Sequence, residues 1–367
     1  MPTNTDHLTP LASSQAPLTR SQRLMSLDFM RGLIMVVLAL EGAGLHDQLE
    51  KYSDNSFLIR QLFHHPWHGL HAWDIVQPAF MFMAGVAMAF SLEKQRQKGI
   101  TWTQSFGKTL KRCGWLFFWG VLDYAVRKTG LSFELWDVLT QLSFTTLVAF
   151  LIFRWPMIAQ LAVCAGLLLI TELLYRCTHV PGFDQPFTDQ HNFGNYMDLL
   201  LMNKINKGGW VAINCVPTAV HTIGGALAGK LLLEPKRQTV KILLIWAAIS
   251  LALGYALDWT NITPIIKRIA TSSFTLVSLG YSILLLCLCY WWIDLKDHRR
   301  HLEFFTIVGM NSIFIYLFFE IVGHRWFNEY VGALTSWTSP IITSLVIFAC
   351  EWGLCYFLYR KKIFFRV

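Results

Sequence analysis

The feature that most constrains this chain is a series of apolar runs that recurs over almost its whole length. About 20 apolar residues in a helix cross the hydrocarbon core of a bilayer. Hydrophobic residues make up 54% of the 367 residues and charged residues only 15%, which is unusual for a soluble protein. The sequence therefore predicts an all-α, polytopic integral membrane bundle of about ten transmembrane helices. The predicted spans lie near residues 27–46, 73–93, 106–126, 136–153, 157–175, 211–232, 240–258, 271–293, 303–322 and 339–358.

The first part of the chain, residues 1–22, is polar and rich in Pro, Ser and Thr. It has no apolar core of the kind that a signal peptide carries, so we expect a disordered cytoplasmic tail. No internal repeat or charge block marks a second domain in the rest of the chain. We therefore expect one transmembrane domain over residues 23–367.

Positive charge is spread unevenly between the two ends of the predicted spans. With the N-terminus in the cytoplasm, twenty Lys and Arg residues fall on the cytoplasmic side and ten on the other, with Arg31 inside the first span. The positive-inside rule then predicts that both termini are cytoplasmic. The net charge of +8 comes from short clusters at the ends of apolar runs. Because these clusters form no basic stripe interleaved with aromatic residues, nucleic acid is not an expected partner.

A dense polar segment, residues 63–74 (FHHPWHGLHAWD), stands directly before the second apolar run and falls in the first outer loop. Imidazole exchanges protons near neutral pH and can also act as a nucleophile, so one interpretation is a catalytic centre. A second is that His and Trp decorate the membrane interface. The third is a metal site, because three of the histidines have helical spacing, but Pro66 and Gly69 interrupt that helix.

Ionisable residues inside the predicted spans are further candidates, because charge in a bilayer is costly. Asp28 and Arg31 are three residues apart and are expected to pair on one helical face. Asp74 differs from the other acidic residues because it directly follows the histidines. The remaining acidic candidates near span ends are Glu41, Asp123 and Glu320.

Several short motifs occur in one order along residues 20–325. They are S-L-D-F-M-R-G (residues 26–32), H-H-P-W-H-G (64–69), D-I-V-Q-P (74–78), Y-M-D (196–198), A-G-K (228–230), P-I-I-K (264–267) and G-M-N-S (309–312). Together they resemble the transmembrane acyltransferase family of heparan-α-glucosaminide N-acetyltransferase. The chain is most similar to the compact bacterial members of that family, so we expect it in a bacterial inner membrane.

This resemblance implies transfer of an acetyl group from cytoplasmic acetyl-CoA to an amino sugar or glycan on the outer, periplasmic side. The family's essential histidine lies three residues before Trp, which is His64 here. His64 is expected to act either as the acyl acceptor or as the general base, with Asp74 and His65 as the other catalytic candidates. Both routes stay open, as does the choice between N- and O-acetylation.

Binding residues also follow from the resemblance. Glu41 takes the place of a small polar residue of the family, Trp67 belongs to the histidine motif, and Lys267 is a candidate for contact with CoA. Asn311 and Ser312 are the other two CoA candidates. The expected partners are the lipid bilayer, acetyl-CoA and a carbohydrate acceptor; a homodimer is left open, and no metal is expected.

Two functions of other classes are weighed against the enzyme. The first is a transporter of sugars or proton-coupled solutes, with His64, Asp74 and Glu41 as a proton relay. Many transporters consist of inverted repeats, and the sequence shows no such halves. The second is a structural or metal-sensing membrane protein without turnover.

Overall fold

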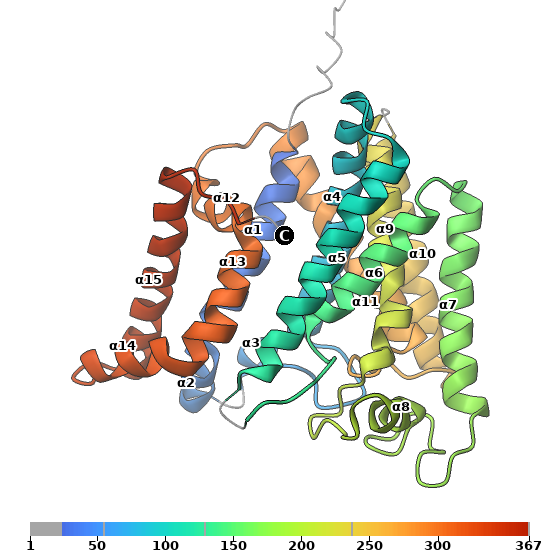
Figure 1. Cartoon of the computed structure of the whole chain (residues 1–367), viewed down its shortest axis with the longest axis horizontal. Helices are drawn as coiled ribbons and strands as arrows, with labels where there is room; N and C mark the ends of the chain where they lie inside the picture. Colours follow the sequence, from blue (N-terminus) through green and yellow to red (C-terminus); the bar gives the residue numbers. More distant parts are fainter. Residues whose placement is uncertain (1–23, 54–55, 128–129, 236–237, 366–367) are drawn as a thin grey trace, which may run out of the picture.

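The structure is a computed structural model that describes residues 24–53, 56–127, 130–235 and 238–365. Figure 1 shows a bundle of helices, and the described residues add one isolated β-bridge, between His68 and Ile266. The predicted all-α class is therefore confirmed. The expected tail at residues 1–22 lies outside the described residues.

The first half of the bundle runs from α1 to α7. Its long helices are α1 (Met25–Gly42), α4 (Val76–Gln97), α5 (Trp102–Ala125), α6 (Val138–Ile152) and α7 (Met157–Cys177). Short helices α2 (Leu45–Tyr52), α3 (Phe57–Arg60) and η1 (Ala72–Ile75) lie between α1 and α4.

The second half begins with α8 (Phe193–Met202) and the short turn η2 (Ala212–Asn214). Long helices follow at α9 (Cys215–Leu233), α10 (Thr239–Trp259), α11 (Ser272–Cys289, continued by η3, Tyr290–Leu295) and α15 (Pro340–Arg360). Between η3 and α15 lie α12 (Glu303–Met310), α13 (Ser312–Leu317), the π-helical turn η4 (Phe318–Phe327) and α14 (Asn328–Leu334).

Every predicted span coincides with a helix, but the helices differ in how well they suit a bilayer. Among the described residues, six helices are long and apolar enough to cross a membrane, or up to eight if two bent pairs each count as one span. The bent pairs are α1 with α2, at 66°, and α12 with the helix that begins at Ser312, at 77°. The short α6 and the charge-bearing α5 are not among the six, so the count of ten spans stays a prediction.

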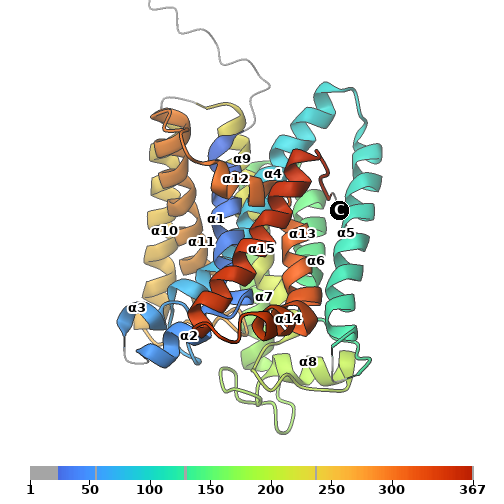
Figure 2. The same cartoon turned by 90° about the vertical axis from the view of Figure 1, so that its left-hand side faces the viewer.

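Close helix packing holds the centre of the bundle together, with α4 and α9 side by side along their length (Figures 1 and 2). Gly225 of α9 lies so near α4 that a Cβ atom there would stand 1.9 Å from the carbonyl oxygen of Phe82. Small residues allow such an approach, as expected for a GxxxG segment in a membrane. At the start of α1, the expected Asp28–Arg31 pair is present, at 4.0 Å.

The two ends of the bundle differ in character. Helix α1 begins and α15 ends at the same end, which also holds the basic residues after α4 and at the start of α5 (Figure 1). The opposite end, which we call the site end, gathers α2, α3, α8, α14 and the loop 61–71 (Figure 2). This arrangement places the histidine segment away from the basic end.

Candidate active site

The histidine loop, residues 61–71, is irregular and is fixed by a second loop at the same end. The Gly69 N–H donates to Ile265 O at 2.9 Å, and His68 Nε2 lies 2.8 Å from Asp258 Oδ1. Gly69 has φ +140°, a conformation that favours glycine, and a Cβ there would meet the ring of His65 at 2.5 Å. The loop therefore has one defined path, and its break in helical order agrees with the presence of Pro66 and Gly69.

Asp74 organises the loop from inside. It lies in the first turn of η1, has no exposed side-chain surface, and accepts the backbone N–H groups of His71 at 2.8 Å and His65 at 3.2 Å through Oδ2. Its other oxygen, Oδ1, lies 2.8 Å from Nδ1 of His64. A carboxylate at Nδ1 holds the hydrogen on that nitrogen, so the lone pair of His64 is on Nε2.

Lys267 completes the group from the loop between α10 and α11. Its Nζ lies 3.0 Å from His64 Nδ1, 3.5 Å from His64 Nε2 and 3.8 Å from Asp74 Oδ1. Only 7% of its side chain is exposed. We call His64, Asp74 and Lys267 the site triad.

The charges of the triad set the protonation of the imidazole. Burial lowers the pKa of His64 to about 4, and the Lys267 ammonium lowers it too, against the opposing effect of Asp74. Burial also lowers the pKa of Lys267 to about 8, although Asp74 opposes this shift. At neutral pH His64 is therefore neutral and able to accept a proton or an acyl group, while most Lys267 side chains keep their charge.

The triad opens onto a cavity of about 260 Å³, which we call the site cavity. A third of the His64 side chain is exposed. The cavity lies between α1, α4, α5, the start of α6 and η4, so it penetrates the bundle. The side chains that line it are aromatic, acidic and polar: His64, Lys267, Trp73, Trp136, Trp210, Tyr124, Tyr316, Gln77, Glu41, Asp123, Asp137 and Glu320, together with Arg127 and several aliphatic residues.

Two indole rings, of Trp210 and Trp136, form walls of the site cavity, and a buried carboxylate holds the second of them. Trp210 meets His64 edge to face at 5.3 Å, and the Lys267 ammonium lies 5.3 Å from the centre of the Trp210 ring. Asp198, in α8, accepts the N–H of Ala212 at 2.8 Å and Nε1 of Trp136 at 2.9 Å. Burial raises the pKa of Asp198 to about 7 against both hydrogen bonds. Asp198 thus joins the segment after Trp210 to the opposite wall.

Acidic residues form the deeper side of the site cavity. Asp137 accepts from Tyr316 at 2.8 Å, and Asp123 pairs with Arg325 at 3.0 Å and with Arg127 at 3.2 Å. Glu41 accepts no hydrogen bond from any described residue, and Glu320 lies 3.7 Å from His324. Glu41 is therefore the carboxylate of the site cavity best able to receive an outside hydrogen-bond donor.

The structure separates the predicted site residues into two groups. His64, Asp74, Lys267 and Glu41 are brought together at the site cavity. The ring of His65 instead packs against His71, at 4.8 Å, and only its backbone touches Asp74. Lys267 contacts His64 at the site end and does not lie at the basic end.

The remaining predicted residues lie elsewhere. Trp67 donates from Nε1 to Phe187 O at 2.8 Å and packs at the site end. Asn311 binds the last described residues, from Nδ2 to Ile363 O at 3.2 Å and from Phe365 N to Oδ1 at 3.1 Å. Ser312 is buried at the start of α13 and does not line the site cavity.

Some residues of the site cavity had no signal in the sequence. Trp210, Asp137 and Tyr316 contribute walls and hydrogen bonds, but each is an ordinary residue in its local segment. Asp137 caps the first turn of α6 by accepting Leu139 N at 2.7 Å, which is the only pattern that could have drawn attention to it. In the part of the chain that the structure describes, no three His, Cys, Asp or Glu residues are placed to hold a metal ion.

The chain is similar to two curated proteins, both named heparan-alpha-glucosaminide N-acetyltransferase. It is 24% identical to the human protein, over 94% of this chain and 60% of that protein. It is 23% identical to the mouse protein, over 98% of this chain and 63% of that protein. No protein-family model matches the chain. The resemblance seen in the motifs is thereby confirmed as a distant relationship, in which the chain spans about 60% of the relatives' length.

Proposed function

We propose that this protein is a membrane-embedded acetyltransferase. It would move the acetyl group of cytoplasmic acetyl-CoA to an amino sugar or glycan on the other side of the membrane. The observation that carries the proposal is the site triad, a neutral His64 oriented by Asp74 at the mouth of a cavity that enters the bundle. The distant relatives, whose name describes acetyl transfer to a glucosaminide, support the same reaction class.

In a direct route, the amine nitrogen of the acceptor attacks the thioester carbonyl carbon while His64 Nε2 takes its proton. The C–S bond then breaks, its electron pair goes to sulfur, and His64 returns the proton to the thiolate to give free CoA. Asp74 stabilises the imidazolium that forms in between. The Lys267 ammonium is the nearest cation to the negative oxygen that develops on the carbonyl.

In a two-step route, His64 Nε2 itself attacks the carbonyl carbon and the CoA thiolate leaves. The acceptor amine then attacks the acetyl-imidazole, the N–C bond breaks, and its electron pair returns to Nε2, which takes the amine proton and passes it to the CoA thiolate, so that neutral His64 and free CoA remain. Asp74 plays the same part, because it holds Nδ1–H throughout. Trapping by acid after mixing with labelled acetyl-CoA alone separates the routes, since only the second leaves label on His64.

The site cavity limits the acceptor. At about 260 Å³ it is smaller than most pockets for drug-sized ligands, so it has room for one sugar ring beside the thioester rather than for an internal segment of a chain. Its aromatic and acidic lining suits the faces and hydroxyl groups of a sugar. The acceptor would therefore be a free amino sugar or a terminal residue of a glycan.

The test of the function uses purified full-length protein with labelled acetyl-CoA and glucosamine. We expect acetylated sugar from the wild type and a loss of about hundredfold or more in His64→Ala. His179→Ala is the matched control, because His179 is exposed in a loop at the same end and lies outside the site cavity. Solute flux into vesicles without any acetyl transfer would instead establish a transporter.

A further inference from the structure

A second cavity, of about 630 Å³, opens near the basic end of the bundle between α4, α5, α6 and the last described residues. We call it the basic pocket. Three cationic side chains line it, Lys108, Lys111 and Arg112, and none of the described residues that line it carries a carboxylate. Its other walls are aromatic and polar, from Trp115, Trp119, Phe365, Ser91 and Gln95. This composition suits an anion attached to a flat ring.

Arg112 gives the basic pocket a hydrogen-bond donor that has no partner. Its Nε is buried and finds no hydrogen-bond partner among the described residues. Buried polar groups in folded proteins are nearly always paired, so an unpaired guanidinium nitrogen calls for a partner from outside. Lys108 and Lys111 are exposed on the same helix, and no ion pair to either is found in the described part of the chain. Phosphate oxygens are the partners that such a cluster binds best.

The basic pocket and the site cavity lie on one face of α4. Gln77 and Phe80 line the site cavity, and Met88, Ser91 and Gln95 line the basic pocket, at intervals of three, four or eight residues. Such spacing keeps side chains on one helical face. The eight residues from Phe80 to Met88 rise about 12 Å. The small Ala84 and Ala87 occupy this face between the two cavities.

Helix α5 repeats the arrangement on the other side. Arg112, Trp115 and Trp119 line the basic pocket, and Asp123 lines the site cavity. The step from Trp119 to Asp123 is one turn, a rise of about 6 Å. The two cavities therefore follow one another along α4 and α5, with the cationic cluster at one end and the space in front of His64 at the other.

The last described residues form one side of the basic pocket. Asn311, which is fully buried, binds Ile363 O and Phe365 N, and Phe365 meets Trp119 edge to face at 6.1 Å. Asn311 thus acts as a positioning residue for a wall of the basic pocket.

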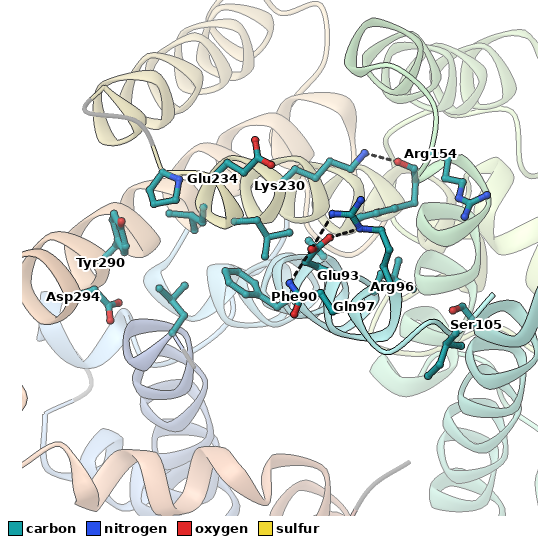
Figure 3. Close-up of a pocket in the computed structure, with 18 of the residues that line it drawn as sticks. Phe90, Glu93, Arg96, Gln97, Ser105, Arg154, Lys230, Glu234, Tyr290 and Asp294 are labelled. Atoms are coloured by element: carbon teal, nitrogen blue, oxygen red, sulfur yellow. Dashed lines mark hydrogen bonds and ion pairs between the residues drawn. The ribbon is translucent and has the colours of Figure 1, made fainter. Parts of the chain in front are cut away.

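A third cavity, of about 650 Å³, lies at the same end and is the obvious rival (Figure 3). It contains three carboxylates, Glu93, Glu234 and Asp294. Its four cations all have partners within the protein. Arg96 pairs with Glu93 at 2.9 Å, Arg299 pairs with Asp297 at 2.7 Å, Lys230 donates to Phe153 O, and Arg154 lies over the Trp102 ring. On α4 it shares Leu92 with the basic pocket, but Ala89, Glu93 and Arg96 lie on a different helical face from Gln77, Phe80 and Met88. This mixed-charge pocket therefore neither attracts an anion strongly nor leads to His64.

From these observations we infer that the basic pocket binds the phosphate groups of the CoA donor. The flexible arm of the donor then extends along α4 and α5 from the basic pocket to the site cavity and presents the thioester to His64. This inference rests on the proposed function for the identity of the ligand. The phosphate of an anionic lipid headgroup has the same chemistry, so the test must separate the two sources.

The test measures binding of CoA and of pantetheine, which lacks the phosphates, by calorimetry on purified full-length protein. Arg112→Gln should weaken CoA binding by about tenfold or more and leave pantetheine unchanged, because only a phosphate contact is removed. The double variant Lys108→Gln/Lys111→Gln should weaken CoA binding and reduce its dependence on salt. Arg96→Gln, in the mixed-charge pocket, is the matched control and should bind CoA as the wild type does. If Arg112→Gln fails to fold, the double variant still tests whether the basic pocket binds the phosphate groups.

Two further measurements make the outcomes distinct. His64→Ala should keep its affinity for CoA, so binding can be established even if no acetyl transfer is found. Unchanged CoA affinity in both Arg112→Gln and the double variant overturns the inference and leaves the proposed function standing. The inference also fails if phosphatidylglycerol vesicles stabilise the wild type but not Arg112→Gln while CoA binds both equally. If the wild type binds no CoA, acetyl-CoA is not its donor and the proposed function is wrong.

Discussion

The ammonium of Lys267 lies 3.0 Å from Nδ1 of His64, although 203 positions separate the two residues along the chain. This contact places a positive charge beside the imidazole, while Asp74 supplies the compensating negative charge at the same ring nitrogen, 3.8 Å from the ammonium. A histidine in this setting stays neutral well below neutral pH. Its basic form is therefore available over the whole physiological range.

Removing the Lys267 charge should change the pH dependence of the reaction. In the wild type the acid limb of the rate profile should fall near pH 4, because below the pKa of about 4 His64 is protonated and no longer a base. In Lys267→Met this limb should move up toward the ordinary value of 6.5, because one cause of the lowered pKa is gone. Initial rates measured against pH in the wild type and in Lys267→Met give the position of the acid limb in each.

Lys204→Met is the control for this profile, because Lys204 pairs with Glu134 at 3.2 Å at the same end and does not line the site cavity. An acid limb that stays in place in Lys267→Met would show that Lys267 does not act on His64.

Asp74→Asn should lower kcat by about hundredfold or more, because the amide no longer fixes the proton on His64 Nδ1. Affinity for CoA should stay near that of the wild type. Asp258→Asn separates this effect from a loosened loop, since Asp258 holds His68 and Ile265 N but does not touch the imidazole. Equal losses of kcat in the two variants would contradict a role of Asp74 at the imidazole.

Glu41→Gln should raise KM for the amino sugar by about tenfold and leave KM for acetyl-CoA unchanged. The physical reason is that Glu41 faces the site cavity without a hydrogen-bond donor of its own, so the acceptor is its partner. Inhibition by glucose, which lacks the amine, should be affected less than binding of glucosamine. A parallel change for both sugars would argue against contact with the amine.

Asp198→Asn should raise KM and lower kcat together, by a few-fold to about tenfold. An amide oxygen cannot replace both carboxylate oxygens, which accept from Ala212 N and Trp136 Nε1, so either the Trp136 ring or the segment after Trp210 loses its hydrogen bond. Intrinsic tryptophan fluorescence should report the released ring. Asp184→Asn, on the exposed loop at the same end, should change neither quantity.

Gly225→Ala should lower the melting temperature, because the added methyl group would stand 1.9 Å from the Phe82 carbonyl and force α4 and α9 apart. Overpacking of this kind costs about 1–3 kcal/mol. Gly114→Ala is the matched control in α5, since a Cβ there meets nothing within 4 Å. Thermal unfolding in detergent compares the two variants. Equal melting temperatures would show that α4 and α9 can move apart at this contact without loss of stability.

Much of the local structure could be predicted from the sequence. The apolar runs predicted a helix at each of ten places, because about 20 apolar residues satisfy their own backbone hydrogen bonds only as a helix in lipid. Pro66 and Gly69 predicted that the histidine segment is not helical. The ten-residue spacing of His64 and Asp74 brought the two into one loop and turn, where they are 2.8 Å apart.

The packing of the helices could not be predicted in the same way. In a membrane the lipid is as apolar as the protein core, so hydropathy does not mark the buried face of a helix. The very apolar helices α7 and α10 are buried over only 11% and 22% of their residues, whereas the span that contains α9, the least apolar of the six, is buried over 72%. The sequence therefore left open which helices line the cavities.

The roles of the more distant motif residues followed from that packing. Lys267 and Asn311 were both candidates for contact with CoA. The fold places Lys267 beside His64 and uses Asn311 to hold residues 363–365. The sequence by itself determined the helices, the membrane setting and the His64–Asp74 pair, because these depend on neighbours along the chain. Only the tertiary structure placed Lys267 and Trp210 beside His64 and Arg112 in the basic pocket, because helix register and facing surfaces set the distances between residues far apart in sequence.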